Sequence, residues 1–258
     1  MWQKRGTKEF YALWVQVRWV VYLLRVTLGV TMPIHCHETK QELAQSLANY
    51  IASLIKINIQ EKDECHLVLS GGNTPKQCFS LLAEKQGIDW RKVFFYLTDE
   101  RHYPVDHPDR NDFMVDQVLW SKLPLSENNI KRIHTEKGVE QAAQDYHQLL
   151  KSAPMMDIVI LGIGEDGHTA SLFPDNIALK NIHLAVPVYH SPKAPDERVS
   201  MGMLTIQGAK KRIVLVSGSG KNDILQKIQQ GKSFPVTQVG TCEWFIDKDA
   251  IGQLTLDL

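Results

Sequence analysis

Short apolar runs alternate with amphipathic stretches along the chain from Met32 onward. The apolar runs predict buried strands, and the stretches in which apolar residues recur every three or four positions predict helices. The predicted strands are a first one near residue 34 and those at 66–69, 93–97, 157–161 and 213–216. The predicted helices start near Thr39 and Pro75 and cover 111–120, 140–150 and 222–229. Strands that are apolar throughout and separated by helices indicate a mostly parallel twisted sheet with helices on both faces. We therefore expect one Rossmann-like α/β domain.

Helix boundaries are marked by capping residues at two places. Thr39 can cap the first helix, and Glu42, three residues later, completes a capping box. Pro75 suits the first turn of the helix that follows Gly71 and Gly72. No repeat or linker divides the chain, so we assign residues 32–258 to a single domain.

Residues 1–31 differ from the rest of the chain. Arg18 and Arg25 interrupt an aromatic and β-branched stretch that would otherwise be long enough to span a membrane. The longest uncharged run, 19–24, is too short for a secretory signal. We favour an upstream start that adds nothing to the fold, and an interfacial amphipathic helix or a targeting segment are the alternatives.

The amino-acid composition is that of an ordinary globular protein. The 258 residues are 43% hydrophobic and 22% charged, and the formal net charge is zero. We therefore expect no general attraction to nucleic acid or to a membrane surface, and any anion site must be built locally. Four scattered cysteines fit reduced, buried thiols in a cytoplasmic protein. His35-Cys36-His37 is not a metal site, because alternate strand residues point to opposite faces. We expect a monomer without a metal.

Four segments place unusual residues where predicted strands end, and ligands bind at that edge of a parallel sheet. The first segment is Ser70-Gly71-Gly72-Asn73-Thr74-Pro75. Its glycines and the following helix N-terminus suit a phosphate, and a tight turn capped by Asn73 or Thr74 is the alternative. The second is Asp99-Glu100-Arg101-His102. Arg101 offers a fork for a phosphate or carboxylate, unless the segment is a solvated loop in which Arg101 pairs with its acidic neighbours.

The third segment, 162–174, has glycines at 162, 164 and 167 with Asp166 and His168 between and after them. Histidine can take a proton from water and return it, and Asp166 could orient its ring or bind a sugar hydroxyl. The alternative is an exposed loop histidine. The fourth group is basic: Arg198, and Lys221 after a glycine-rich turn. Each suits a phosphate, and plain surface charge is the alternative.

Together these segments resemble the 6-phosphogluconolactonase family, whose superfamily includes glucosamine-6-phosphate deaminase. The resemblance runs from about Ile34 to about Ile251. It is carried by LSGGNTPK (69–76), LTDERHYPVDHPDRND (97–112), DIVILGIGEDGHTASLFP (157–174), ERVSM (197–201), LVSGSGKNDIL (215–225) and EWFIDKDA (243–250). Asn73 departs from the serine that is more frequent in the family. The resemblance implies a glucosamine-6-phosphate-deaminase-type fold, no cofactor, and a phosphorylated sugar lactone as substrate.

The resemblance also implies roles for individual residues. His168 is the general base that activates water, with Asp166 as its orienter, and Arg101 is the third catalytic residue. Arg101, Arg198, Lys221 and the loop of Gly71, Gly72, Asn73 and Thr74, with Asp99 beside them, bind the substrate and its phosphate. Two other functions remain as alternatives. A deaminase or isomerase of the superfamily would carry a Glu where this chain has Phe173. A non-catalytic sugar-phosphate sensor would be expected to lose His168 and keep the cations.

Overall fold

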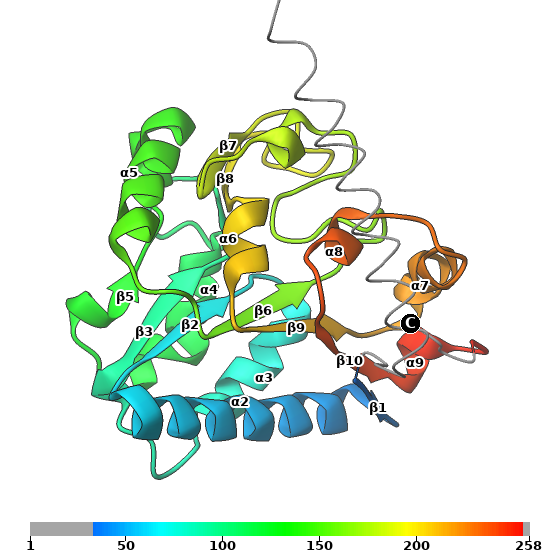
Figure 1. The fold of residues 1–258 in the computed structure, drawn as a ribbon, viewed down its shortest axis with the longest axis horizontal. Coiled ribbons are helices and arrows are strands. Elements are labelled where there is room, and N and C mark those ends of the chain that lie inside the picture. Colours follow the sequence, from blue (N-terminus) through cyan, green and yellow to red (C-terminus); the bar gives the residue numbers. More distant parts are fainter. Residues whose placement is uncertain (1–32, 255–258) are drawn as a thin grey trace, which may run out of the picture.

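Seven parallel strands form the centre of the molecule (Figure 1). In spatial order they are β1 (Ile34–His37), β10 (Glu243–Asp247), β9 (Lys211–Val216), β6 (Ile158–Gly162), β2 (Cys65–Leu69), β3 (Val93–Leu97) and β5 (Ile130–Lys131). The computed structural model describes residues 33–254. The extension predicted for residues 1–31 therefore lies outside the described residues, as do the last four residues. The single α/β domain and its mostly parallel sheet are confirmed.

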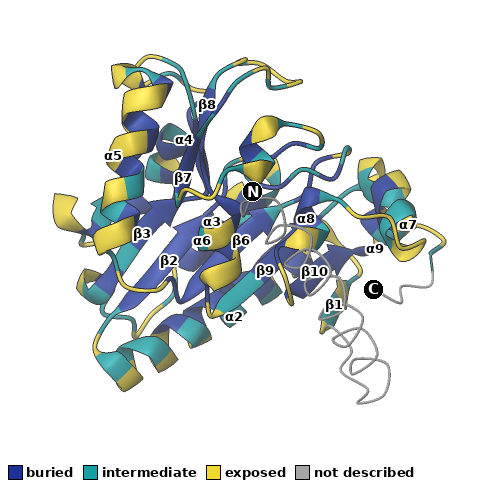
Figure 2. Cartoon of the chain, turned by 45° about the horizontal axis from the view of Figure 1, so that its top comes forward, coloured by how far each residue is buried: buried dark blue, intermediate teal, exposed yellow. Residues whose placement is uncertain are grey.

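The central strands are apolar because both of their faces are covered. Every residue of β2 is buried, and so is every residue of β10, which includes Trp244 and Phe245 (Figure 2). The predicted strands 66–69, 93–97, 157–161 and 213–216 correspond to β2, β3, β6 and β9. The pattern did not predict β5 or β10. β5 has two residues, and β10 begins and ends with an acidic residue.

Helices cover the sheet on both sides. They are α2 (Lys40–Lys62), α3 (Asn73–Ala83), α4 (Asn111–Val118), α5 (Val139–Ser152), α6 (Met203–Gly208), α7 (Asn222–Gln229), α8 (Pro235–Gln238) and α9 (Lys248–Ile251). Right-handed crossovers fix their sides. The chain moves along the sheet from β1 through β2 and β3 to β5, and then back through β6, β9 and β10. Accordingly, α2 and α3 lie below the sheet in Figure 1, and α5, α6 and α8 lie above it.

The reversal of direction creates a crevice between β2 and β6. These strands are neighbours, yet the connections that leave their carboxyl ends run to opposite faces of the sheet. Such a switch point leaves a gap between the first turns of the two connections, and α/β proteins bind ligands there. The two segments that leave these strands are the Gly71 turn and the loop that carries His168.

A second, antiparallel sheet was not predicted from the sequence. It consists of β4 (Asp99–Arg101), β8 (Arg198–Met201) and β7 (Ala185–Val188). The interpretation of 99–102 as a solvated loop is therefore wrong, because β4 pairs with β8 and Glu100 is fully buried. The register sets Arg101 directly opposite Arg198, so this sheet joins two segments that lie almost a hundred residues apart.

The start of α2 and the strand β1 follow the local predictions in part. Thr39 caps α2 by accepting a hydrogen bond from the Glu42 N–H, but the Glu42 carboxylate accepts from the Glu38 N–H, one residue before the cap. In β1, His35 and His37 both stack with Phe245, whereas Cys36 points away and is exposed. Cys36 is thus an exception to the predicted buried cysteines. The other three are buried.

Two features are absent from residues 33–254. Within that range no helix is both long enough and apolar enough to cross a membrane. Nor do three His, Cys, Asp or Glu side chains of the described residues come together in a group that could hold a metal ion.

Candidate active site

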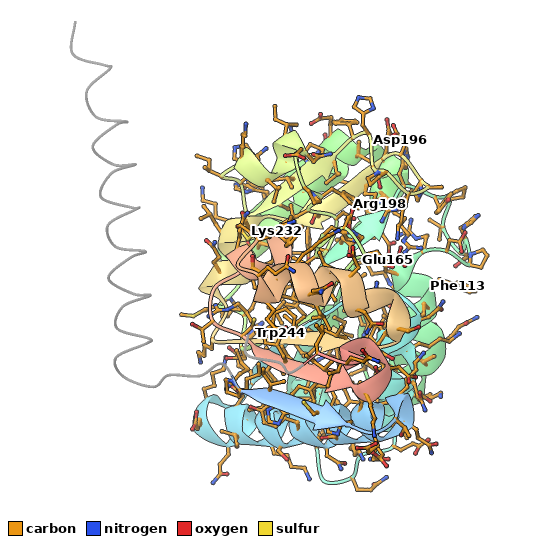
Figure 3. All side chains as sticks on the ribbon, turned by 90° about the vertical axis from the view of Figure 1, so that its right-hand side faces the viewer. Phe113, Glu165, Asp196, Arg198, Lys232 and Trp244 are labelled. Atoms are coloured by element: carbon orange, nitrogen blue, oxygen red, sulfur yellow. The ribbon has the colours of Figure 1, made fainter. Side chains whose placement is uncertain are left out.

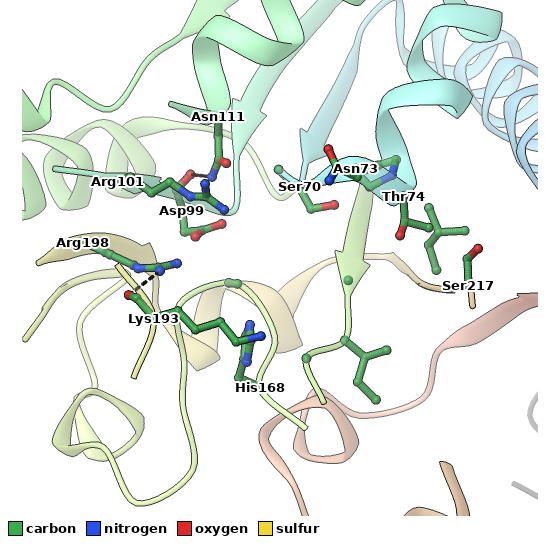
Figure 4. Close-up of a pocket in the computed structure, with 18 of the residues that line it drawn as sticks. Ser70, Asn73, Thr74, Asp99, Arg101, Asn111, His168, Lys193, Arg198 and Ser217 are labelled. Carbon is green, nitrogen blue, oxygen red and sulfur yellow. Dashed lines mark hydrogen bonds between the residues drawn. The ribbon is translucent and has the colours of Figure 1, made fainter. Parts of the chain in front are cut away.

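A pocket of about 300 Å³ opens at the carboxyl ends of β2, β6 and β9 (Figure 4). A volume of this size suits a small ligand. Most of the residues predicted for the site line it: Gly71, Gly72, Asn73, Thr74, Asp99, Arg101, His168, Arg198 and Lys221. Asp166 is not among the lining residues but contacts His168. The four segments singled out in the sequence therefore meet at one place.

His168 and Asp166 form a hydrogen-bonded pair. The Asp166 carboxylate lies 2.5 Å from Nδ1 of His168 and also accepts from the His168 backbone N–H. Burial opposes ionisation of Asp166, but the hydrogen bond and charge of His168 outweigh it and lower the pKa of this carboxyl to about 2. An ionised carboxylate only accepts, so Nδ1 carries the hydrogen and Nε2 of the neutral ring is left as a base.

The loop that holds this pair depends on its glycines. The Gly164 N–H donates to the carbonyl of His168, and the Gly167 N–H donates to the carbonyl of Gly164. Gly167 has a φ of +82°, in the left-handed region that favours glycine. At Gly164 a Cβ would lie 2.0 Å from Nδ1 of His168. Glycine at 164 is therefore what lets the imidazole fold back against its own loop.

Phe173 forms the other support of the imidazole. Its ring centroid lies 4.5 Å from that of His168, and the Arg198 guanidinium lies over the same ring, 5.5 Å from its centroid. Contacts with the carboxylate and the aromatic ring hold the His168 side chain in place, and it is 17% exposed. The alternative of an exposed loop histidine does not describe this residue.

Glu100 positions the wall that faces the imidazole. Its carboxylate accepts three backbone N–H groups, from Arg101, Asn111 and Asp112, each at 2.8 Å. Burial, followed by the charge of Asp112, raises the pKa of Glu100 to about 8, although the three N–H donors act in the opposite direction. Glu100 thus joins β4 to the start of α4. The sequence indicated a cost for burying charge here but gave no role to this residue.

Asp99 and Arg101 lie on either side of Glu100 in β4. Asp99 accepts from the hydroxyls of Thr98 at 2.9 Å and Ser171 at 2.6 Å. Arg101 donates from Nη1 to the carbonyl of Asp109, and its buried Nε has no protein partner among the described residues. No ion pair joins Arg101 to its acidic neighbours within residues 33–254, so its charge is available to the pocket.

The Gly71 turn presents backbone N–H groups to the pocket. Gly72 is the N-cap of α3 with a φ of +102°, and no side chain caps that helix. The alternative of a turn capped by Asn73 or Thr74 is therefore wrong. Asn111 packs directly against Gly71, where a Cβ would lie 1.8 Å from its Oδ1. The uncapped N-terminus of α3 suits an anion.

The positive charge of the pocket comes from several segments. Lys221 belongs to the short 3-10 helix η6 (Ser219–Lys221), and burial, with Lys193 nearby, lowers its pKa. Lys193 lines the pocket although the sequence did not single it out. Its signal was a lysine between Pro192 and Pro195, in a loop that the prolines stiffen. A chain of zero net charge thus gathers Arg101, Lys193, Arg198 and Lys221 at one pocket, as expected for a locally built anion site.

Three further polar residues of the pocket had been given no role of their own, although Ser70 and Ser217 belong to segments that the sequence pattern had indicated. Ser70, Asn111 and Ser217 line the pocket. The hydroxyl of Ser70 is buried and has no hydrogen-bond partner among the described residues. Sequence patterns give little warning of such residues, because Ser and Asn are ordinary in turns and at helix starts.

Comparison with known proteins gives the same picture. A model of the family "Glucosamine-6-phosphate isomerases/6-phosphogluconolactonase" matches residues 38–246. The human 6-phosphogluconolactonase is 36% identical over 242 residues, which cover 86% of this chain and 94% of that protein. The enzyme of that name from Aggregatibacter actinomycetemcomitans is 34% identical over 221 residues, 80% of this chain and 95% of that protein.

A solved structure extends the comparison to three dimensions. The crystal structure of 6-phosphogluconolactonase from Thermotoga maritima is 27% identical and superposes with a TM-score of 0.78, covering 84% of this chain and 99% of that one. The range that the family model matches, 38–246, includes the segments that build the pocket. On this evidence the chain belongs to the family of glucosamine-6-phosphate isomerases and 6-phosphogluconolactonases.

Proposed function

We propose that this protein hydrolyses 6-phospho-D-glucono-1,5-lactone to 6-phospho-D-gluconate, a step of the oxidative pentose phosphate pathway. Relatives named 6-phosphogluconolactonase, over 30% identical along nearly their whole length, support this reaction. The observation that carries the proposal is the pocket itself, which sets a carboxylate-backed imidazole among four cations and an uncapped helix N-terminus.

The chemistry follows from the orientation of His168. Because Nδ1 is bonded to Asp166, Nε2 takes a proton from water as the water oxygen attacks C1 of the lactone. The tetrahedral intermediate carries a negative oxygen, and a donor or cation facing it is worth about 3 kcal/mol. The C1–ring oxygen bond then breaks, and His168 returns the proton to the departing ring oxygen. Water has been added and no other reactant is consumed.

Arg101, Lys221 and the Gly71 turn would hold the 6-phosphate and so place C1 against the base. Fixing a substrate in this way removes much of the entropic cost of the reaction. The monomeric state stays a prediction. The scheme needs no cofactor, and the cytoplasmic location stays a prediction.

The Phe173 ring favours lactone hydrolysis over the deaminase alternative. A sugar isomerisation requires a second group to move protons between carbons, and the position where the deaminases carry Glu is occupied by this aromatic ring, 4.5 Å from the imidazole. The ring can support His168 but cannot exchange a proton.

The test is lactone hydrolysis by the wild type and by His168→Ala, each measured against spontaneous ring opening. Loss of a general base should lower kcat by a factor on the order of 10² or more. His183→Ala, which removes an exposed imidazole outside the pocket, should match the wild type. Equal rates for His168→Ala and the wild type would refute the role of this residue. Turnover of glucosamine 6-phosphate instead of the lactone would refute the proposed substrate.

A further inference from the structure

Arg198 donates three of the five N–H groups of its guanidinium to the loop that precedes it. Its Nη2 donates to the carbonyls of Lys193 at 2.8 Å and Ala194 at 3.0 Å, and its Nε donates to the carbonyl of Pro195 at 3.3 Å. The residue is only 5% exposed. Figure 3 shows Arg198 lying inward of the loop that carries Asp196. One face of the guanidinium is also covered by Phe173.

This arrangement makes the loop and Arg198 depend on each other. A buried guanidinium needs acceptors, and here three consecutive carbonyls supply them. The planar fork of Arg is required, because a Lys amine in the same place could not donate along the edge of a backbone turn from two nitrogens. Arg198 is fixed in turn by β8, which pairs with β4 on one side and with β7 on the other.

The side chain that the loop offers to the pocket is Lys193. Figure 4 shows it pointing into the pocket on the side of His168, with Arg198 bonded to the Lys193 carbonyl behind it. No carboxylate of residues 33–254 forms an ion pair with Lys193. Lys221 lines the same pocket, and burial lowers its pKa; the charge of Lys193 acts in the same direction, whereas Glu165 and Asp166 act in the opposite one. Because both ammonium groups line one pocket, an anion that binds between them would be stabilised by both charges.

We propose that Lys193 and Lys221 bind the substrate's phosphate as a pair, and that Arg198 is a positioning residue that acts by holding the Lys193 loop. This inference rests on the proposed function for the identity of the anion. It reassigns Arg198, which the sequence predicted to contact the phosphate itself. Lys193 is then a phosphate-binding residue that only the tertiary structure brings to the site.

A double-mutant cycle tests the dependence of one residue on the other. We expect Lys193→Gln to raise KM for the phosphorylated lactone about 10-fold and Arg198→Lys to do nearly the same. The double variant should be no worse than Lys193→Gln alone, because a loop without its lysine has nothing to position. With unphosphorylated glucono-1,5-lactone, Lys193→Gln should match the wild type. Lys151→Gln, which removes an exposed charge on α5, is the control.

Hydrogen exchange of the backbone amides distinguishes positioning from direct contact. Arg198→Lys should speed exchange in residues 191–197, whereas Lys193→Gln should leave it unchanged. If exchange is unaltered in Arg198→Lys and the two losses in kcat/KM multiply, Arg198 contacts the substrate and the proposal is wrong.

Binding of inorganic phosphate, measured by calorimetry, separates this inference from the proposed function. It requires no turnover, and Lys193→Gln should weaken it several-fold. If the wild type does not open the lactone, but Lys193→Gln binds phosphate more weakly than the wild type does, the proposed function is refuted and the two-lysine site is supported. A wild type that opens the lactone while Lys193→Gln binds phosphate normally would refute the site alone.

Discussion

Gly164→Ala should disable His168 without touching its side chain chemically. The added Cβ would lie 2.0 Å from Nδ1 and 2.2 Å from Cε1 of His168, and 2.5 Å from Oδ1 of Asp166. Carbon atoms pack at about 3.5 Å or more, so the imidazole and the carboxylate must each retreat by about 1 Å. A misplacement of that size can cost about 10²-fold in rate, and we expect kcat for lactone hydrolysis to fall by a factor on the order of 10².

Stability should change much less than activity in this variant. The bond between Asp166 and His168 is charge-assisted, but the Asp166 side chain is 38% exposed, so water replaces part of what is lost. We expect the free energy of unfolding to fall by about 1 kcal/mol, which lowers Tm by about 3 °C in a chain of this size.

Gly208→Ala is the matched control. It makes the same chemical change at the last residue of α6, where a Cβ meets nothing within 4 Å, outside the pocket. It should keep the wild-type kcat. The reasoning fails if folded Gly164→Ala hydrolyses the lactone within about threefold of the wild-type rate, since the imidazole would then tolerate a displacement of this size.

Three further changes test the supports of the pocket. Asp166→Asn places an amide beside Nδ1 of His168 and favours the wrong tautomer, so kcat should fall by roughly 10² to 10⁴ in steady-state assays, and a change below about threefold would contradict the orienting role. Glu100 keeps a proton in the folded chain that the unfolded chain loses near the ordinary glutamate pKa of 4.5, so wild-type stability should fall as pH rises from 4.5 to about 8, by at most about 1.4 kcal/mol per pH unit. Denaturant unfolding of Glu100→Gln should lack that decline, and parallel curves for the two proteins would refute it. Gly71→Ala should displace Asn111, lower stability by about 2 kcal/mol and raise KM about 10-fold, and an unchanged KM would count against the turn as a binding element.

Much of the fold was predictable because it follows from local patterns. β2, β3, β6 and β9 bury both faces, so each reads as a continuous apolar run. The second sheet was not predictable in this way. β4 and β8 are short, carry charged residues, and become strands only because they pair with each other.

The same division applies to the site. Residues with unusual chemistry at a strand end, such as His168 in its glycine-rich loop, could be found in the sequence, and so could Asp166, two positions away. Lys193, Ser70 and Asn111 could not be assigned roles in this way, although Lys193 lies between Pro192 and Pro195 and Ser70 lies in the first segment. Their place in the pocket depends on the side chains and backbone that lie opposite them in the fold. Glu100 is a similar case, since its role depends on N–H groups that α4 brings to it.

By itself, the sequence determined the class of fold, the segments that meet at the edge of the sheet, and the imidazole with its carboxylate. Periodicity, glycine spacing and residue chemistry are all properties of neighbours along the chain. Only the tertiary structure distinguishes a cation that faces a ligand from one that holds a loop in place. Whether Arg198 faces a ligand or the carbonyls of its own loop depends on where three backbone oxygens come to lie, and a linear pattern does not contain that distance.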